Sequence, residues 1–162
     1  QGDPLQEGIR TGPLARLDLA KNLAQQLASS IKAGAQLEYG GVSEGCNFMP
    51  SLLTNVRPGM SAFDQETFGP LAAVISAKDE KEAITLANLS PYGLAGSVWT
   101  KDVDRGIHIA RQITTGAVFI NSRVKSDPRL PFGGVKKSGY GRELGRLGIL
   151  EFVNAKTIAA EQ

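Results

Sequence analysis

The N-terminal part of the chain carries a helical repeat of apolar positions. Between residues 15 and 33 these positions recur every three or four residues and share one face: Ala20, Leu23, Ala24, Leu27, Ala28 and Ile31. Gly34 follows, and glycine suits the end of a helix because it accepts a left-handed backbone. The spacing therefore predicts a helix over 15–33. Short strands are expected at 35–39 and 52–56, with a loop over 40–50 between them.

From residue 70 onwards, continuous apolar runs alternate with helical patterns. Runs at 71–75, 94–100 and 117–120 predict strands, and the first and third are typical of strands buried on both faces. One helix is expected to begin at Asp79, and a second at Thr100 or Asp102. This alternation predicts an α/β fold, with a mostly parallel sheet, right-handed crossovers and flanking helices.

The segment after the third expected strand is the natural place for a site. Ligands of parallel sheets bind beyond the C-terminal ends of the strands, so the long loop 121–141 is expected to be functional. A short helix is expected at about 142–150. The tail 152–159 is partly alternating and predicts a strand. It has no later partner in the chain and needs a sheet edge elsewhere, such as one on another subunit.

The composition narrows the function classes. The 162 residues are 41% hydrophobic and 21% charged, which is typical of a globular domain. A net charge of +2 gives no reason to expect a nucleic-acid or membrane partner. One cysteine and one histidine exclude an internal disulfide and a multi-cysteine or multi-histidine metal site. We therefore expect no bound metal. The N-terminus resembles no signal peptide, so we expect a cytoplasmic protein.

The glycine-rich segment after the third expected strand suggests a phosphate loop, but the match is incomplete. Gly134 and Gly139 have the right spacing, yet Tyr140 and Gly141 stand where a lysine and a serine or threonine are required. The glycines at 139, 141 and 145 miss the dinucleotide fingerprint by one residue. A tight loop that needs backbone freedom before a helix is the favoured interpretation.

Other candidate residues leave alternatives open. Cys46 could act as a nucleophile, but no adjacent base lowers its pKa, and His108 lies within an expected helix. A plain loop thiol is favoured.

Glu66, just before the first buried strand, could accept hydrogen bonds from sugar hydroxyls. On its own it is more simply a solvated turn carboxylate. A basic cluster is more typical of a solvated surface or an anion contact than of nucleic-acid binding: Lys136, Lys137, Arg142 and Arg146.

Several motifs occur together in one order along the chain. They are Glu66-Thr67-Phe68-Gly69-Pro70, Asn88-Leu89-Ser90-Pro91-Tyr92-Gly93-Leu94, Phe119-Ile120-Asn121, Pro131-Phe132-Gly133-Gly134-Val135-Lys136-Lys137-Ser138-Gly139 and Gly141-Arg142-Glu143-Leu144-Gly145. With these motifs the chain resembles, over essentially its whole length, the C-terminal part of the aldehyde dehydrogenase superfamily. The loop 125–129 is most similar to the succinate-semialdehyde dehydrogenase branch.

This resemblance implies roles for individual residues. Glu66 matches the carboxylate that holds the nicotinamide ribose hydroxyls, and Phe68 matches the aromatic residue beside the nicotinamide. Phe132 matches an aromatic residue of the substrate tunnel. Ser126 lies where that branch has a serine facing the distal carboxylate of the substrate. The resemblance thus implies NAD or NADP as cofactor and a small aldehyde, expected to be succinate semialdehyde, as substrate.

The resemblance also implies that essential parts are absent from this chain. The nucleophilic cysteine, the glutamate that activates water and the oxyanion asparagine belong to regions upstream of Gln1, and Cys46 aligns with none of them. We therefore expect no catalytic residue here, a partial catalytic domain at 1–150 and an oligomerisation strand at 151–162. Residues 152–159 would then pair subunits in a homo-oligomer. The alternative is a non-catalytic domain that self-associates or binds a partner through its terminal strand.

Overall fold

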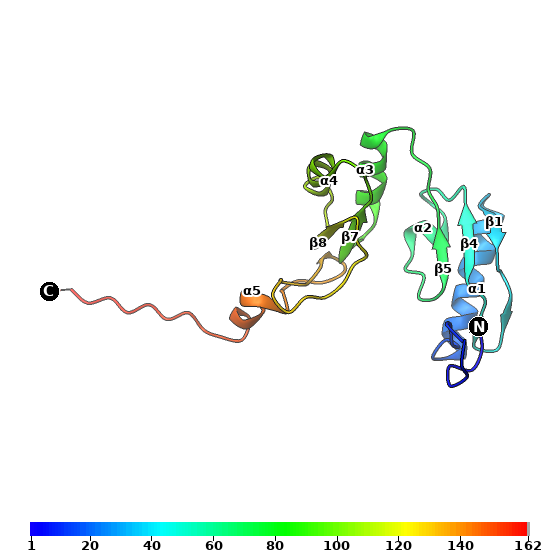
Figure 1. Cartoon of the computed structure of the whole chain (residues 1–162), viewed down its shortest axis with the longest axis horizontal. Coiled ribbons are helices and arrows are strands. Elements are labelled where there is room, and N and C mark those ends of the chain that lie inside the picture. Colours follow the sequence, from blue (N-terminus) through cyan, green and yellow to red (C-terminus); the bar gives the residue numbers. More distant parts are fainter. Residues whose placement is uncertain (162) are drawn as a thin grey trace. The chain divides into compact units, whose positions relative to one another are not determined.

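The computed structural model describes residues 1–161 (Figure 1). The chain divides into two compact units, Gln1–Lys78 and Asp79–Gln162, each with its own sheets. The boundary expected between residues 150 and 151 does not concern compact units. It separates a partial catalytic domain from an oligomerisation strand, and it stays a prediction.

The first unit is built from one long helix and a small sheet. Helix α1 (Leu17–Lys32) confirms the helix predicted over 15–33. Strand β1 (Gln36–Tyr39) pairs antiparallel with β4 (Ser51–Thr54), and β5 (Leu71–Ala73) pairs parallel with β4. A short helix, α2 (Ser61–Asp64), lies between β4 and β5 in the sequence. Figure 1 shows α1 alongside this sheet.

The loop expected over 40–50 is instead largely a hairpin. Strands β2 (Ser43–Glu44) and β3 (Asn47–Phe48) pair antiparallel around a turn that contains Gly45, whose φ is +56°. Two-residue strands are too short to leave a periodic signal, which explains why the sequence did not predict them. The hairpin matters for packing because Phe48 is only 1% exposed.

Apolar side chains from α1 and the sheet form the core of the first unit. Its buried members are Leu23, Leu27, Ala35, Phe48, Leu53, Val56, Met60 and Leu71. Burying one large aliphatic or aromatic side chain contributes about 1.5–3 kcal/mol. This core therefore fixes α1 against β4 and β5.

The second unit alternates helices and strands, as the sequence predicts. Its N-terminal half contains α3 (Glu80–Leu89), β6 (Tyr92–Gly93), β7 (Ala95–Val98), α4 (Val103–Ala110) and β8 (Ala117–Ile120). The side chain of Asp79 accepts a hydrogen bond from the amide of Glu82 at 2.8 Å, and Asp102 accepts one from Arg105 at 2.9 Å. These bonds confirm a cap at Asp79 and settle the second helix start on Asp102 rather than Thr100.

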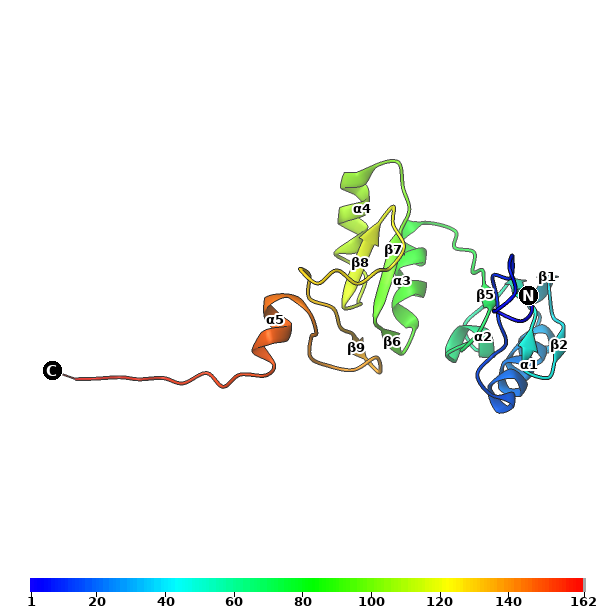
Figure 2. The ribbon, with the colours of Figure 1, turned by 60° about the horizontal axis from the view of Figure 1, so that its bottom comes forward.

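The strands do not form the continuous βαβαβ sheet expected over 71–120. Strands β7 and β8 are parallel and α4 connects them (Figure 2), but β5 pairs with β4 in the first unit. The helices and parallel pairs are nevertheless of the predicted α/β kind. Burial on both faces was wrong for β5, since Ala72 is exposed, and β8 is only half-buried. Alternation along a chain predicts strands but does not say which strands are neighbours.

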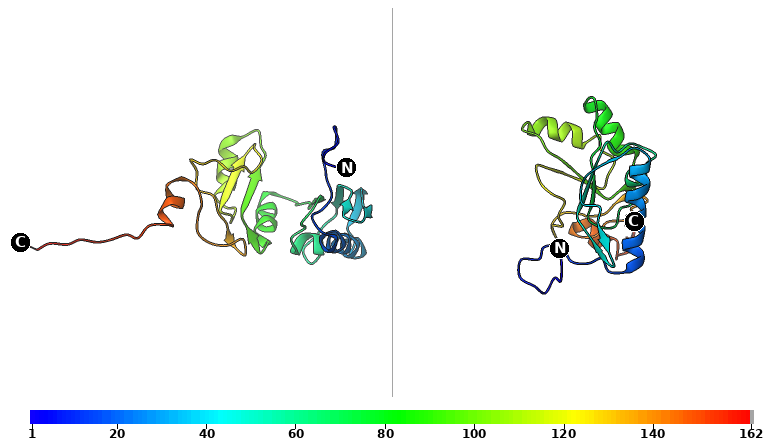
Figure 3. Two further views of the ribbon diagram at one scale, coloured as in Figure 1. Left: turned by 90° about the horizontal axis from the view of Figure 1, so that it is seen from below. Right: turned by 90° about the vertical axis from the view of Figure 1, so that its right-hand side faces the viewer.

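The C-terminal part contains β9 (Val135–Lys136), which pairs with β6, and helix α5 (Gly145–Leu150). Helix α5 is shorter than the helix expected at 142–150. Residues 152–159 form no strand within the part of the chain that the structure describes, and they extend away from α5 in Figure 3. Phe152 is 90% exposed. Pairing of this segment across subunits stays a prediction.

An ion pair shapes the loop between β8 and β9. Arg129 donates to both carboxylate oxygens of Asp127, at 2.9 and 2.7 Å, and its backbone amide donates to the same group at 2.9 Å. The side-chain bonds from Arg129, and then this backbone bond, hold the pKa of Asp127 below its ordinary value. The pKa of the Arg129 guanidinium is raised by the same contact.

Substitution of Gly116 by alanine is expected to destabilise the second unit. The Gly116 amide donates to the carbonyl of Gly93 at 3.0 Å, and a Cβ at position 116 would overlap the carbonyl oxygen of Gly133. We expect Gly116→Ala to lower the free energy of unfolding by about 3 kcal/mol, at the upper end for overpacked sites. Gly96→Ala is the control, because its nearest neighbour would be Ile113 Cγ2 at 3.9 Å. Urea denaturation measures both, and equal effects would contradict the packing argument.

The Asp127–Arg129 pair should be visible in a pH titration. We expect the Asp127 carboxyl to titrate below about 3.9, the ordinary value for aspartate, and to return towards that value in Arg129→Gln. Because the folded pKa is depressed, the pair stabilises the fold above the unfolded pKa. That contribution is lost as the pH falls through the folded value. Carbon-13 NMR of the carboxyl group measures both midpoints, and identical midpoints would show that Arg129 is not the cause.

Candidate functional site

The segment between α2 and β5 presents two of the predicted site residues to solvent. The amide of Gly69 donates to the carbonyl of Thr67 at 2.9 Å, and that of Leu71 donates to Gly69 at 2.8 Å. These two tight turns carry the chain into β5. Glu66 is exposed, and the ring of Phe68 is 67% exposed. The segment thus presents a carboxylate and a largely exposed aromatic ring to solvent, two residues apart.

Helix α1 is hydrogen-bonded to this segment through the side chain of Gln26. The side-chain amide of Gln26 donates to the carbonyl oxygen of Glu66 at 3.1 Å and to Oε1 of Gln65 at 3.2 Å. Gln26 was not among the site residues predicted from the sequence. The available signal was its place on the apolar face of α1, between Leu23 and Leu27, where a polar side chain needs a partner.

The two side chains fit the cofactor that the resemblance implies. No described residue hydrogen-bonds the Glu66 carboxylate, so its oxygens can accept bonds from sugar hydroxyls. The exposed ring of Phe68 offers a flat apolar surface to a flat heterocycle. Together they suit the nicotinamide riboside part of a nucleotide, and the assignment itself stays a prediction.

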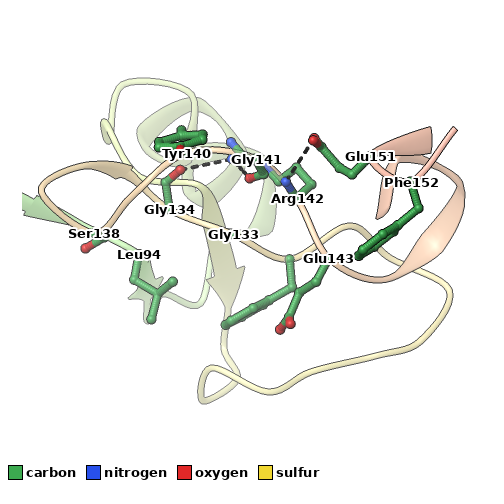
Figure 4. A pocket seen from close by; sticks show the side chains of 11 residues that line it. Leu94, Gly133, Gly134, Ser138, Tyr140, Gly141, Arg142, Glu143, Glu151 and Phe152 are labelled. Carbon is green, nitrogen blue, oxygen red and sulfur yellow. Dashed lines mark hydrogen bonds between the residues drawn. The ribbon is translucent and has the colours of Figure 1, made fainter. Parts of the chain in front are cut away.

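Phe132 lies in the second unit, between two cavities. Its backbone exchanges a pair of hydrogen bonds with Glu143, each 2.8 Å long, which fixes its position in the loop. One cavity, of about 440 Å³, lies against the glycine-rich loop and Phe152 (Figure 4). The other, of about 450 Å³, lies against β8 and is mainly apolar, with Leu130 and Pro131 beside Phe132. An aromatic wall of this kind suits the role that the resemblance implies.

Ser126 does not join Phe132 in the apolar cavity. Its neighbours Lys125 and Asp127 line that cavity, whereas Ser126 is exposed and is not part of the lining. Neighbouring residues of an extended loop point to opposite sides, which accounts for the alternation. The serine and the aromatic ring therefore share one loop but not one cavity, and the role of Ser126 stays a prediction.

Two members of the basic cluster support the loop itself. The guanidinium of Arg142 donates to the carbonyls of Gly134 at 2.9 Å and Gly141 at 2.6 Å (Figure 4). The ammonium of Lys136 donates to the carbonyls of Asn88 and Ser90 at 2.9 and 3.0 Å. Arg142 thus bonds the glycine-rich segment to itself, and Lys136 bonds it to the end of α3. Both contacts agree with the interpretation of a tight loop.

The remaining candidates show no catalytic arrangement. Cys46 is half-buried in the β2–β3 turn, where its carbonyl accepts the amide of Leu14 at 2.8 Å. His108 is exposed on α4. Within residues 1–161, no three His, Cys, Asp or Glu side chains are grouped to hold a metal ion, and no helix has the length and apolarity to span a membrane.

Solved structures of aldehyde dehydrogenases resemble this chain closely. Succinic semialdehyde dehydrogenase from Streptococcus pyogenes, in complex with NADP+, is 36% identical with a TM-score of 0.94, covering 99% of this chain and 36% of that one. A salicylaldehyde dehydrogenase from Pseudomonas putida G7, complexed with salicylaldehyde, is also 36% identical with a TM-score of 0.93, covering 100% of this chain and 34% of that one. These similarities confirm the predicted fold class.

Curated relatives point to one branch. A probable NADP(+) succinate-semialdehyde dehydrogenase of Synechocystis sp. is 48% identical, over 97% of this chain and 35% of its own length. The NAD(P)+ succinate semialdehyde dehydrogenase Sad of Escherichia coli is 44% identical, with the same coverage of 97% and 35%. The chain thus spans about a third of the length of these relatives.

The family itself follows from a match over nearly the whole chain. The model of the aldehyde dehydrogenase family matches residues 1–158. This match includes every motif on which the sequence resemblance was based. The chain belongs to the aldehyde dehydrogenase family.

Proposed function

We propose that this chain is the C-terminal third of an NAD(P)-dependent aldehyde dehydrogenase that oxidises succinate semialdehyde, or a similar aldehyde, to the carboxylic acid. One observation carries the proposal: a carboxylate without a described partner and a largely exposed aromatic ring lie two residues apart, at Glu66 and Phe68. The names of the relatives from Synechocystis sp. and Deinococcus radiodurans, both NADP(+) succinate-semialdehyde dehydrogenases, support the substrate and the cofactor.

The cofactor end of the site is formed by the first unit. Bound NAD(P) would supply the acceptor for the hydride that leaves the substrate. Glu66 accepts hydrogen bonds from the ribose hydroxyls and so restricts the position of the nucleotide. Phe68 packs against the nicotinamide and excludes water from that side. Orientation of this kind is a large part of what a protein contributes to hydride transfer.

The substrate end is formed by the loop that follows β8. Phe132 packs against the short methylene chain of the substrate. Ser126 lies on the same loop but outside the apolar cavity. In this proposal it meets the distal carboxylate beyond the cavity and donates its hydroxyl proton to it, and a bond to a charged group is stronger than one between neutral partners. This division of roles favours a substrate with an apolar middle and an anionic end.

We place the nucleophilic cysteine, the glutamate that activates water and the oxyanion asparagine outside these 162 residues. Cys46 remains a turn thiol in this proposal. Residues 152–159 pair with a sheet of another subunit in a homo-oligomer, in the cytoplasm. The exposure of Phe152, Val153 and Ile158 supports a role for this segment in subunit contacts.

The direct test compares the complete enzyme, with the upstream region that the relatives have, with residues 1–162 alone. With succinate semialdehyde and NADP+ or NAD+, the complete enzyme should form reduced nucleotide at a kcat on the order of 1–10³ s⁻¹. Residues 1–162 alone should form none, because nucleophile and positioned cofactor are both missing. Absorbance of the reduced nicotinamide measures both. Turnover by the short chain, or no turnover by the complete enzyme, would contradict the proposal.

Substitution of Ser126 tests the substrate class. In the complete enzyme, Ser126→Ala should raise KM for succinate semialdehyde roughly tenfold, the effect of losing one hydrogen bond to a charged group. KM for butanal, which lacks the distal carboxylate, should stay the same.

Ser122→Ala is the matched control. Among the described residues its hydroxyl bonds only the neighbouring carbonyl of Arg123, at 3.2 Å, so KM should change for neither aldehyde. Steady-state kinetics with both aldehydes measures the three enzymes. If Ser126→Ala raised KM equally for both aldehydes, Ser126 would have no part in recognising the carboxylate.

A further inference from the structure

One turn of α1 is bonded to the segment that leads to Glu66. The amide of Gln26 donates to the carbonyl of Glu66 and to the side chain of Gln65. The other two links start from Ser29 and Ser30. The Ser29 hydroxyl donates to the Ser61 hydroxyl at 2.8 Å, and the Ser30 hydroxyl accepts the amide of Ala62 at 2.9 Å. Helix α1 therefore holds the segment 61–66 at both ends through side chains.

The link made by Gln26 is deeply buried. Gln26 is 5% exposed, and its neighbours along α1, Leu23 and Leu27, belong to the core. Burial removes water as a competing partner for its amide and keeps the side chain in one orientation. The carbonyl of Glu66 is thus fixed to a helix that the core itself holds in place.

The side-chain amide of Gln26 is only partly satisfied by hydrogen bonds. Its Oε1 atom is buried and has no hydrogen-bond partner among the described residues, so it carries an uncompensated desolvation cost. An apolar side chain of similar volume would avoid that cost, but it would leave the Glu66 carbonyl without the bond from Gln26. The donor side of the amide, which reaches Glu66, is what only a glutamine-like side chain supplies.

We propose that Gln26 is a positioning residue for cofactor binding: it holds the backbone at Glu66 so that the carboxylate is already oriented for the ribose hydroxyls. This inference rests on the proposed function, in which Glu66 binds the ribose. Without the bond from Gln26, the peptide at residues 65 and 66 gains freedom that nucleotide binding must then remove. The binding is weakened accordingly.

Gln25 provides a matched control within the same helix. It is exposed, and no described residue hydrogen-bonds its side chain. The same substitution at the two adjacent glutamines removes the bonds to Gln65 and Glu66 only at position 26. Position 25 controls for the change of side chain on the same helix, although it is exposed where Gln26 is buried.

The first experiment is steady-state kinetics of the complete enzyme. Gln26→Met should raise KM for NADP+ about tenfold, as expected for a lost buried hydrogen bond. KM for succinate semialdehyde, and kcat at saturating nucleotide, should stay within twofold of the unmodified enzyme. Gln25→Met should change none of these. A fall in kcat with an equal rise in both KM values would indicate a merely structural role and overturn the proposal.

The second experiment is a double-mutant cycle with Glu66→Gln. If Gln26 acts through Glu66, adding Gln26→Met to Glu66→Gln should raise KM for NADP+ no further. The same tenfold rise in both backgrounds would overturn the positioning role.

The cycle also separates this inference from the proposed function. An effect of Glu66→Gln without any effect of Gln26→Met overturns only the positioning role. No effect of Glu66→Gln on KM for NADP+ overturns the assignment of Glu66 and the positioning role with it. If Gln26→Met does not fold, Gln26→Asn tests the same claim. Its amide is one methylene too short to reach Glu66, so the same rise in KM is expected, and an unchanged KM would contradict the proposal.

Discussion

The buried amide of Gln26 is the contact that ties the backbone at Glu66 to helix α1. The apolar core fixes α1 against β4 and β5, and Gln26, together with Ser29 and Ser30, fixes the next segment to α1. That segment leads directly to Glu66 and Phe68. The core therefore positions α1, α1 positions the segment 61–66, and this segment positions Glu66 and Phe68. A substitution at any of these levels is expected to shift the parts that follow it.

In the second unit, side-chain bonds to backbone groups likewise hold the loop that carries Phe132. Lys136 and Arg142 donate to backbone carbonyls, and Gly116 lets the chain approach Gly133 closely. These contacts fix the glycine-rich segment, and Phe132 is held by its bridge to Glu143. In both units side chains bonded to backbone groups hold irregular loops in place, which leaves the exposed or cavity-lining side chains free to meet ligands.

Local features of the fold could be predicted from the sequence, and non-local ones could not. The helix at α1, the caps at Asp79 and Asp102 and strand β8 follow from periodicity and capping chemistry within a few residues. The pairing of β5 with β4 depends on which distant edge is available, and the β2–β3 hairpin is too short for a pattern.

The candidate site divides in the same way. Glu66, Phe68 and Phe132 were identified because their motifs resemble a family, and the structure places them where the implied roles are possible. Ser126 was identified from the same kind of evidence but lies outside the apolar cavity. Gln26 belongs to no motif, and its signal in the sequence was its place between Leu23 and Leu27 on the apolar face of α1. Its burial and its bond to Glu66 in the structure identify its contact.

A crystal structure of the complete enzyme with bound NADP+ would show directly whether Glu66 holds the ribose. We expect a Glu66 carboxylate oxygen about 2.5–3.0 Å from a hydroxyl oxygen of the nicotinamide ribose, with the Gln26 amide still bonded to the Glu66 carbonyl. A Glu66 side chain directed into solvent, with the ribose held by other residues, would contradict the central claim.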